Sequence, residues 1–125
     1  MKKTITEDFQ NTVSKYHIWN KSILDIMSKL QNASSKINRA AVKAVTSCGC
    51  MEIDGRKSIV TFEKQDNLCQ LRGDLCDECR ANLEREIGEG FYYMACMCNA
   101  LNLNIDKIIQ KETDRVKTLG KYNLM

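Results

Sequence analysis

The sequence contains no proline, and glycine is absent from residues 1–48. Proline and glycine are the residues that interrupt helices most strongly, so more than a third of the chain is free to form long helices. A β-sandwich or barrel needs turn residues every ~8–12 positions, and that punctuation is absent. At 125 residues, the chain is long enough for a single domain over residues 1–125. We therefore predict an all-α fold.

Apolar residues recur at helical spacing in four stretches, which predicts a four-helix bundle. Thr4 and Glu7 are spaced as a capping box, so the first helix is expected to begin at Thr4 or Thr6. The other helices are expected over residues 22–47, 74–101 and 105 to about 117, the last one capped by Asn104. A turn signal at residues 53–55 and a β-branched, aromatic run at residues 59–62 predict a small irregular or hairpin insert at about residues 49–67.

Hydropathy, cysteine count and net charge indicate where the chain is located and which partners it lacks. No apolar run approaches the ~18–20 residues that cross a bilayer, so we expect no membrane association. The sequence has no signal peptide and an odd number of cysteines, seven, which favours a reducing, cytoplasmic location. A net charge of +3 is too small to indicate nucleic-acid binding.

Four of the cysteines form two closely spaced pairs, Cys48-x-Cys50 and Cys76-x-x-Cys79, with 25 residues between Cys50 and Cys76. Such pairs offer four thiolates to one tetrahedral ion, so we predict that they bind a structural zinc ion, with Cys69 as a possible substitute ligand. The alternative is that these cysteines are reduced and pack as small hydrophobic residues.

A second candidate site lies in the third predicted helix. Glu86 and Glu89 are one helical turn apart, close enough to share a divalent cation such as magnesium. Alternatively, they are solvated carboxylates near the start of a helix, where the helix dipole favours them. The lysines and arginines of residues 29–57 can attract phosphates, or else form a solvated helix face.

The two glutamates begin a longer pattern of an apolar, aromatic run and a leucine-rich turn: Glu86-Ile87-Gly88-Glu89-Gly90-Phe91-Tyr92-Tyr93-Met94, then Cys98-Asn99-Ala100-Leu101-Asn102-Leu103-Asn104-Ile105-Asp106. Over roughly residues 83–117 the chain resembles the MazG-like nucleotide pyrophosphohydrolases, an all-α superfamily. The resemblance implies magnesium-dependent hydrolysis of nucleoside triphosphates to monophosphate and pyrophosphate. It also implies that Glu86 and Glu89 bind magnesium and act in catalysis, and that Lys111 and Arg115 bind the substrate phosphates.

The chain departs from that family at one position of the site. The family carries a further Glu-x-x-Glu on the preceding helix, whereas residues 22–47 contain one acid, Asp25. Two functions therefore stay open. The first is a protein that binds a nucleotide or another phosphate ligand and hydrolyses it if active. The second is a catalytically inactive, zinc-stapled helical interaction or regulatory module.

The third predicted helix is apolar on nearly every side, which three short helices in one small chain cannot cover. We therefore predict a homodimer or a higher oligomer, with Phe91, Tyr92 and Met94 near the symmetry axis.

Overall fold

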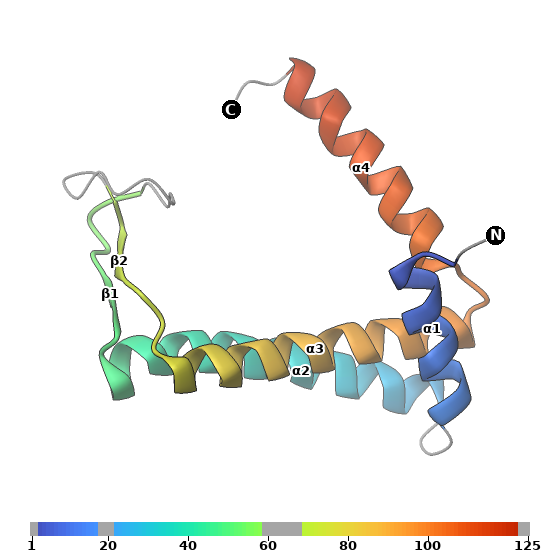
Figure 1. The fold of residues 1–125 in the computed structure, drawn as a ribbon, viewed down its shortest axis with the longest axis horizontal. Helices are drawn as coiled ribbons and strands as arrows, with labels where there is room; N and C mark the ends of the chain where they lie inside the picture. The colour runs from blue at the N-terminus through green and yellow to red at the C-terminus, as the bar shows by residue number, and fades with distance from the viewer. Residues whose placement is uncertain (1–2, 18–21, 59–68, 123–125) are drawn as a thin grey trace. The chain divides into compact units, whose positions relative to one another are not determined.

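The computed structural model describes residues 3–17, 22–58 and 69–122, and the fold is reported for these residues. The chain is predominantly helical, with one small hairpin, so the prediction of an all-α fold is confirmed (Figure 1). In chain order, its elements are α1 (Ile5–Tyr16), α2 (Ile23–Lys43), the short π-helical turn η1 (Ala44–Cys48), β1 (Met51–Ile53), β2 (Leu71–Gly73), α3 (Asp77–Ala100) and α4 (Ile105–Tyr122).

The helix starts follow the capping residues that the sequence indicated. Thr4 caps α1, since its hydroxyl accepts a hydrogen bond from the backbone N–H of Glu7 at 3.0 Å. Asn104 caps α4 in the same way, accepting from the backbone N–H of Lys107 at 3.0 Å. The predicted end of α4 near residue 117 is wrong, because the helix continues to Tyr122. A single glycine, Gly120, weakens a helix by only about 1 kcal/mol and does not by itself end it.

The described residues cluster into two compact units, which we call the terminal unit (residues 1–30 and 91–125) and the central unit (residues 31–90). Helices α2 and α3 each contribute residues to both units. The prediction of a single domain over residues 1–125 stays a prediction.

The core of the terminal unit joins three helices. Its buried residues are Val13 from α1, Ile26 from α2, and Ala95 and Cys96 from α3. Around this small core, four half-buried side chains add apolar contact: Tyr92, Tyr93, Met97 and Ile105. The hydrophobic effect therefore fixes α1 across the two longer helices.

The side-chain amide of Gln10 on α1 forms three hydrogen bonds with residues at and near the turn between α3 and α4. The Gln10 Nε2 atom donates to the Asn99 side-chain oxygen at 2.9 Å and to the Leu103 carbonyl at 2.7 Å. The Gln10 Oε1 atom accepts from the backbone N–H of Ile105 at 2.8 Å. The bond from Ile105 pairs a backbone N–H at the start of α4 that has no partner within its own helix.

In the central unit, α2 and α3 lie side by side and antiparallel. The Lys36 ammonium is 3.9 Å from the Glu89 carboxylate, whereas Cys48, which follows α2, is beside Cys76 at the start of α3. Gly90 is buried against α2, where an added Cβ atom would lie 3.2 Å from the Ile37 side chain. A glycine here allows the two helices to approach closely.

The hairpin between these helices was predicted only in part. Strands β1 and β2 pair antiparallel with Met51 opposite Gly73, so the second strand lies beyond the predicted end of the insert at residue 67. The β-branched run at residues 59–62 lies outside the described residues. Leu71-Arg72-Gly73 has no β-branched residue, so composition alone did not mark it as a strand.

Helix α3 is buried on one side and exposed on another. Ala95 and Cys96 are buried, but Phe91 is 56% exposed and Met94 is 50% exposed. The exposed sides are consistent with the expectation that one small chain cannot cover this helix, and the oligomer stays a prediction.

Candidate metal centre

The two predicted cysteine pairs come together in the central unit. The sulfurs of Cys48, Cys50, Cys76 and Cys79 all lie within 4.8 Å of one another, and those of Cys48 and Cys76 are 3.7 Å apart. Within the described part of the chain, these four form the one group of three or more cysteine, histidine or acidic residues placed to share a metal ion. The predicted ligand set is therefore confirmed as a cluster that could hold a metal ion.

The first pair is positioned by the irregular end of α2. The π-helical turn η1 ends at Cys48, and Gly49 follows with a φ of +82° that L-residues rarely adopt. The Gly49 N–H closes the turn on the Ala44 carbonyl at 3.0 Å. The chain therefore reverses within one residue, which brings Cys50 back beside Cys48.

The second pair is positioned by the hairpin and by the start of α3. Gly73 has a φ of +90°, and a Cβ atom added there would lie 2.4 Å from the Cys50 carbonyl oxygen. This close approach joins the end of β2 to the residue before β1, and it places Cys76 beside the first pair. Cys79 follows one helical turn later, so its side chain lies near that of Cys76.

Hydrogen bonding makes the four thiols unequal. The Cys79 backbone N–H donates to the Cys76 sulfur at 3.4 Å, and this bond, with help from the neighbouring thiols, lowers the pKa of Cys76 to about 7. The pKa of the Cys79 thiol is raised, because its hydrogen bond to Cys76 favours the protonated form. Cys76 is thus the first thiolate of the cluster, and the thiolate is the form that binds metals.

The remaining cysteines lie apart from this cluster. Cys69, predicted as a possible substitute ligand, is buried, and its thiol donates to the Leu71 carbonyl at 2.8 Å. Cys96 is a core residue of the terminal unit, and Cys98 is half-buried on the same helix. All seven cysteines are free thiols.

The predicted carboxylate pair has a different environment. Glu86 is 3.7 Å from the Arg85 side chain, and Glu89 is 3.9 Å from Lys36. Their side chains are 16% and 35% exposed, so both face partly inward. Within the described residues, no third carboxylate, cysteine or histidine joins them in a metal-binding group.

The predicted phosphate-binding residues lie on α4, in the terminal unit. Lys111 and Arg115 are both exposed. Arg115 forms a two-bond ion pair with Glu112, one turn earlier, and this pairing lowers the pKa of the Glu112 carboxyl. The structure therefore gives Arg115 a partner on its own helix.

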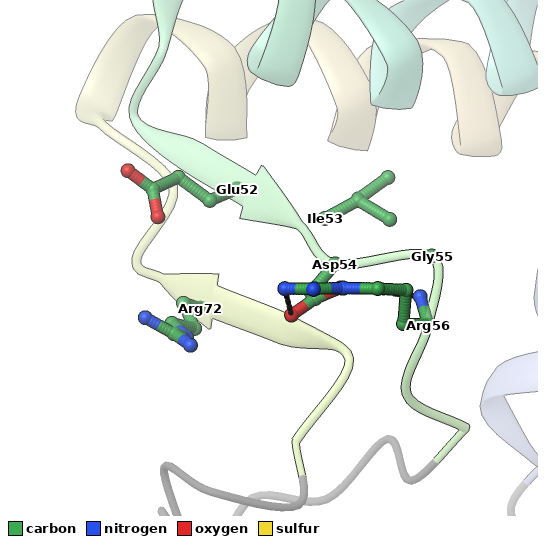
Figure 2. Close-up of a pocket in the computed structure, with 6 residues that line it drawn as sticks. All are labelled: Glu52, Ile53, Asp54, Gly55, Arg56 and Arg72. Carbon is green, nitrogen blue, oxygen red and sulfur yellow. Dashed lines mark hydrogen bonds and ion pairs between the residues drawn. The ribbon is translucent and has the colours of Figure 1, made fainter.

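A pocket on the hairpin is lined by residues 52–56 and by Arg72 (Figure 2). The Arg56 side chain donates to the Asp54 carboxylate at 3.2 Å and, with the Arg56 backbone N–H, holds the pKa of that carboxyl below its usual range. Glu52 and Arg72 are opposite each other in the strand register. The charges of this pocket balance, so it has no net charge to select a ligand.

Sequence reasoning missed a second pocket in the central unit, whose lining includes Arg39, Lys43 and Arg85. The basic residues of α2 were recognised only as possible phosphate contacts or a solvated face. Their spacing marks one face of α2, but it does not reveal that Arg85 and Asn82 of α3 complete a pocket with them.

Comparisons of the chain with protein-family models, with curated proteins and with solved structures give no match. In the described residues, no helix is long and apolar enough to cross a membrane.

Proposed function

We propose that the chain is a helical interaction module whose hairpin is held between α2 and α3 by a structural zinc ion. The convergence of four thiol sulfurs within 4.8 Å carries this proposal. Zinc–sulfur bonds of about 2.3 Å in a tetrahedron put the sulfurs roughly 3.8 Å apart. The 3.7 Å between the Cys48 and Cys76 sulfurs supports a site of this size.

The donor set favours a structural rather than a catalytic ion. Four thiolates complete a tetrahedral shell and leave no open position for water or substrate. Soft sulfur ligands in this geometry select zinc or iron and reject magnesium and calcium.

The ion would stabilise the short hairpin formed by β1 and β2. Strands β1 and β2 have three residues each, and an isolated two-stranded hairpin of this size is marginal in water. The two ligand pairs stand on either side of the hairpin, so the ion ties both of its ends to the helices. The hairpin then offers Ile53, Arg56 and Arg72 on a fixed scaffold, and we assign it as the surface that contacts a partner.

Elemental analysis of the reduced, purified chain tests this proposal. We expect one zinc ion per chain after expression with zinc, and loss of that ion in Cys76→Ser and Cys79→Ser. Cys98→Ser is the matched control, because Cys98 is a free thiol outside the cluster and should leave the zinc content unchanged. Wild-type protein with far less than one zinc per chain would refute the zinc centre, and one iron per chain would assign it to iron.

A second candidate function is the magnesium-dependent nucleotide binding or hydrolysis implied by the resemblance to MazG-like enzymes. It is favoured by Glu86, whose partly buried carboxylate lines a pocket with basic side chains that suit phosphates. Glu86→Gln and Glu89→Gln should then each weaken magnesium-dependent nucleotide binding, since an amide keeps the size but removes the charge. Equal binding by wild type and both variants in calorimetry would exclude this function.

A further inference from the structure

Beside the cysteine cluster, α2 and α3 of the central unit line an open surface pocket of about 240 Å³, which we call the basic pocket. Six side chains give it its polar character: Lys36, Arg39, Lys43, Asn82, Arg85 and Glu86. Lys36, Arg39 and Lys43 recur at spacings of three and four, which puts them on one face of α2. The ion pair between Lys36 and Glu89 shows that this face is turned toward α3.

The charges in the basic pocket do not balance. Four lining residues are cations and one, Glu86, is an acid. Glu86 is paired with Arg85 at 3.7 Å, and Lys36 is paired with Glu89 at 3.9 Å. Arg39 and Lys43 have no ion pair with any residue in the described part of the chain. Two uncompensated positive charges thus face one small cavity, where their mutual repulsion favours an anion.

We propose that the basic pocket binds the phosphate group of a small phosphorylated molecule directly, without magnesium. Arginine matches two phosphate oxygens with two parallel N–H donors, and lysine adds a point charge. The Asn82 amide supplies a further donor at the same cavity. Pockets for whole drug-sized ligands begin at about 300 Å³, so this smaller cavity suits a phosphate or diphosphate group with the rest of the ligand outside.

The unpaired positive charges of Arg39 and Lys43 also have an alternative explanation. Cys79 also lines the basic pocket, and one zinc ion with four thiolates carries a net charge of about −2. Arg39 and Lys43 would then be counter-charges of the metal centre. The two explanations differ in their consequence, because counter-charges influence zinc retention whereas ligand contacts influence phosphate binding.

Titration calorimetry with inorganic pyrophosphate, on the zinc-replete full chain without magnesium, tests the proposal. We expect one saturable site, with affinity about tenfold lower in Arg39→Gln and in Lys43→Gln, since each loses a charge-assisted hydrogen bond. Arg80→Gln is the matched control, because Arg80 is exposed near the start of α3 and lies outside the lining. Glu86→Gln should bind severalfold more tightly, which is opposite to the effect expected for a magnesium site.

Several results would overturn the proposal. The absence of saturable binding would do so, as would an equal loss in Arg80→Gln, which would indicate unspecific charge attraction. Loss of zinc from Arg39→Gln and Lys43→Gln, with unchanged pyrophosphate affinity, would assign both residues to the metal centre. An oligonucleotide that binds more tightly than pyrophosphate and loses affinity in Arg39→Gln would assign the pocket to a nucleic-acid backbone. Zinc content measured in each sample keeps these outcomes separate from a failure of the zinc centre itself.

Discussion

Removing the proposed zinc ion from the four-cysteine cluster is expected to lower the melting temperature of the chain by about 13 °C. The proposed ion would join two parts of the chain that are separated by a loop of 25 residues between the ligand pairs. In the unfolded chain without metal, this loop is free to open. With zinc in excess the unfolded chain also holds the ion on these thiolates, so closing the loop costs the unfolded chain this freedom and favours the folded state, as a disulfide does.

The magnitude follows from the length of the loop. Closing a loop of 25 residues restricts the unfolded chain by about 3.5 kcal/mol at 25 °C on the chain-entropy relation. An unfolding entropy of about 2.1 cal/mol/K per residue gives about 0.26 kcal/mol/K for 125 residues. Dividing the first figure by the second yields a shift of about 13 °C when the chain unfolds as one cooperative unit.

Thermal unfolding followed by circular dichroism, with a sulfur-free reductant present, measures the shift between zinc-loaded and chelator-treated protein. Cys76→Ser should melt at the metal-free temperature with or without zinc. Cys98→Ser should keep the full zinc-dependent shift, even if its own melting temperature differs, because Cys98 lies outside the cluster. A zinc-dependent shift below about 3 °C in wild type, or an equal shift in Cys76→Ser, would refute the cross-link.

Three further results are expected. In metal-free protein at pH 7, iodoacetamide should modify Cys76 first, because a pKa of about 7 leaves half of this thiol ionised. Added zinc should protect Cys76 from the reagent, and mass spectrometry locates the modified residue. Gln10→Ala should lower the free energy of unfolding by about 2–3 kcal/mol in a urea titration, since three hydrogen bonds lose their partner. Gly73→Ala should speed zinc transfer to a chelator, because its Cβ atom would collide with the Cys50 carbonyl, whereas Gly55→Ala meets open space and should not.

The features that sequence predicted well depend on neighbours along the chain. Helix starts follow from Thr4 and Asn104, because a cap bonds to a backbone group three residues away. The cysteine pairs were recognised because each has the local spacing of a chelating pair, two and three residues apart. That both pairs share one site is a long-range feature, but zinc chemistry restricts it to few alternatives.

The features that sequence missed depend on how distant segments pair. Strand β2 contains no β-branched residue, and its position is fixed by the approach of Gly73 to Cys50. The basic pocket exists because α2 and α3 align with Lys36 beside Glu89, a register that neither helix specifies alone. Sequence did not show which sides of α3 the chain covers, because composition measures how apolar a helix is and not where its neighbours lie.

The exposed apolar side chains of α3 and α4 lead to a prediction about self-association. Phe91 and Met94 recur with helical spacing on α3 and are at least half exposed. On α4, every residue from 107 to 120 is exposed, including Ile108, Ile109 and Val116. Many exposed large apolar side chains on two helices of a small protein favour a surface that a partner covers. A second copy of the chain is the simplest partner, since a two-fold interface needs only one self-complementary face.

We therefore expect light scattering at micromolar concentration to give about twice the 14.3 kDa mass of one chain. Phe91→Asp and Met94→Asp should shift it toward monomer without loss of helical content, because both side chains are already exposed within the chain and contribute little to its core. Ile53→Asp provides the control, since it places the same charge at an exposed apolar position on the hairpin. A monomeric wild type would contradict the prediction. Dissociation by Ile53→Asp alone would instead move the self-association surface to the hairpin, and α3 would then be left open for a different partner.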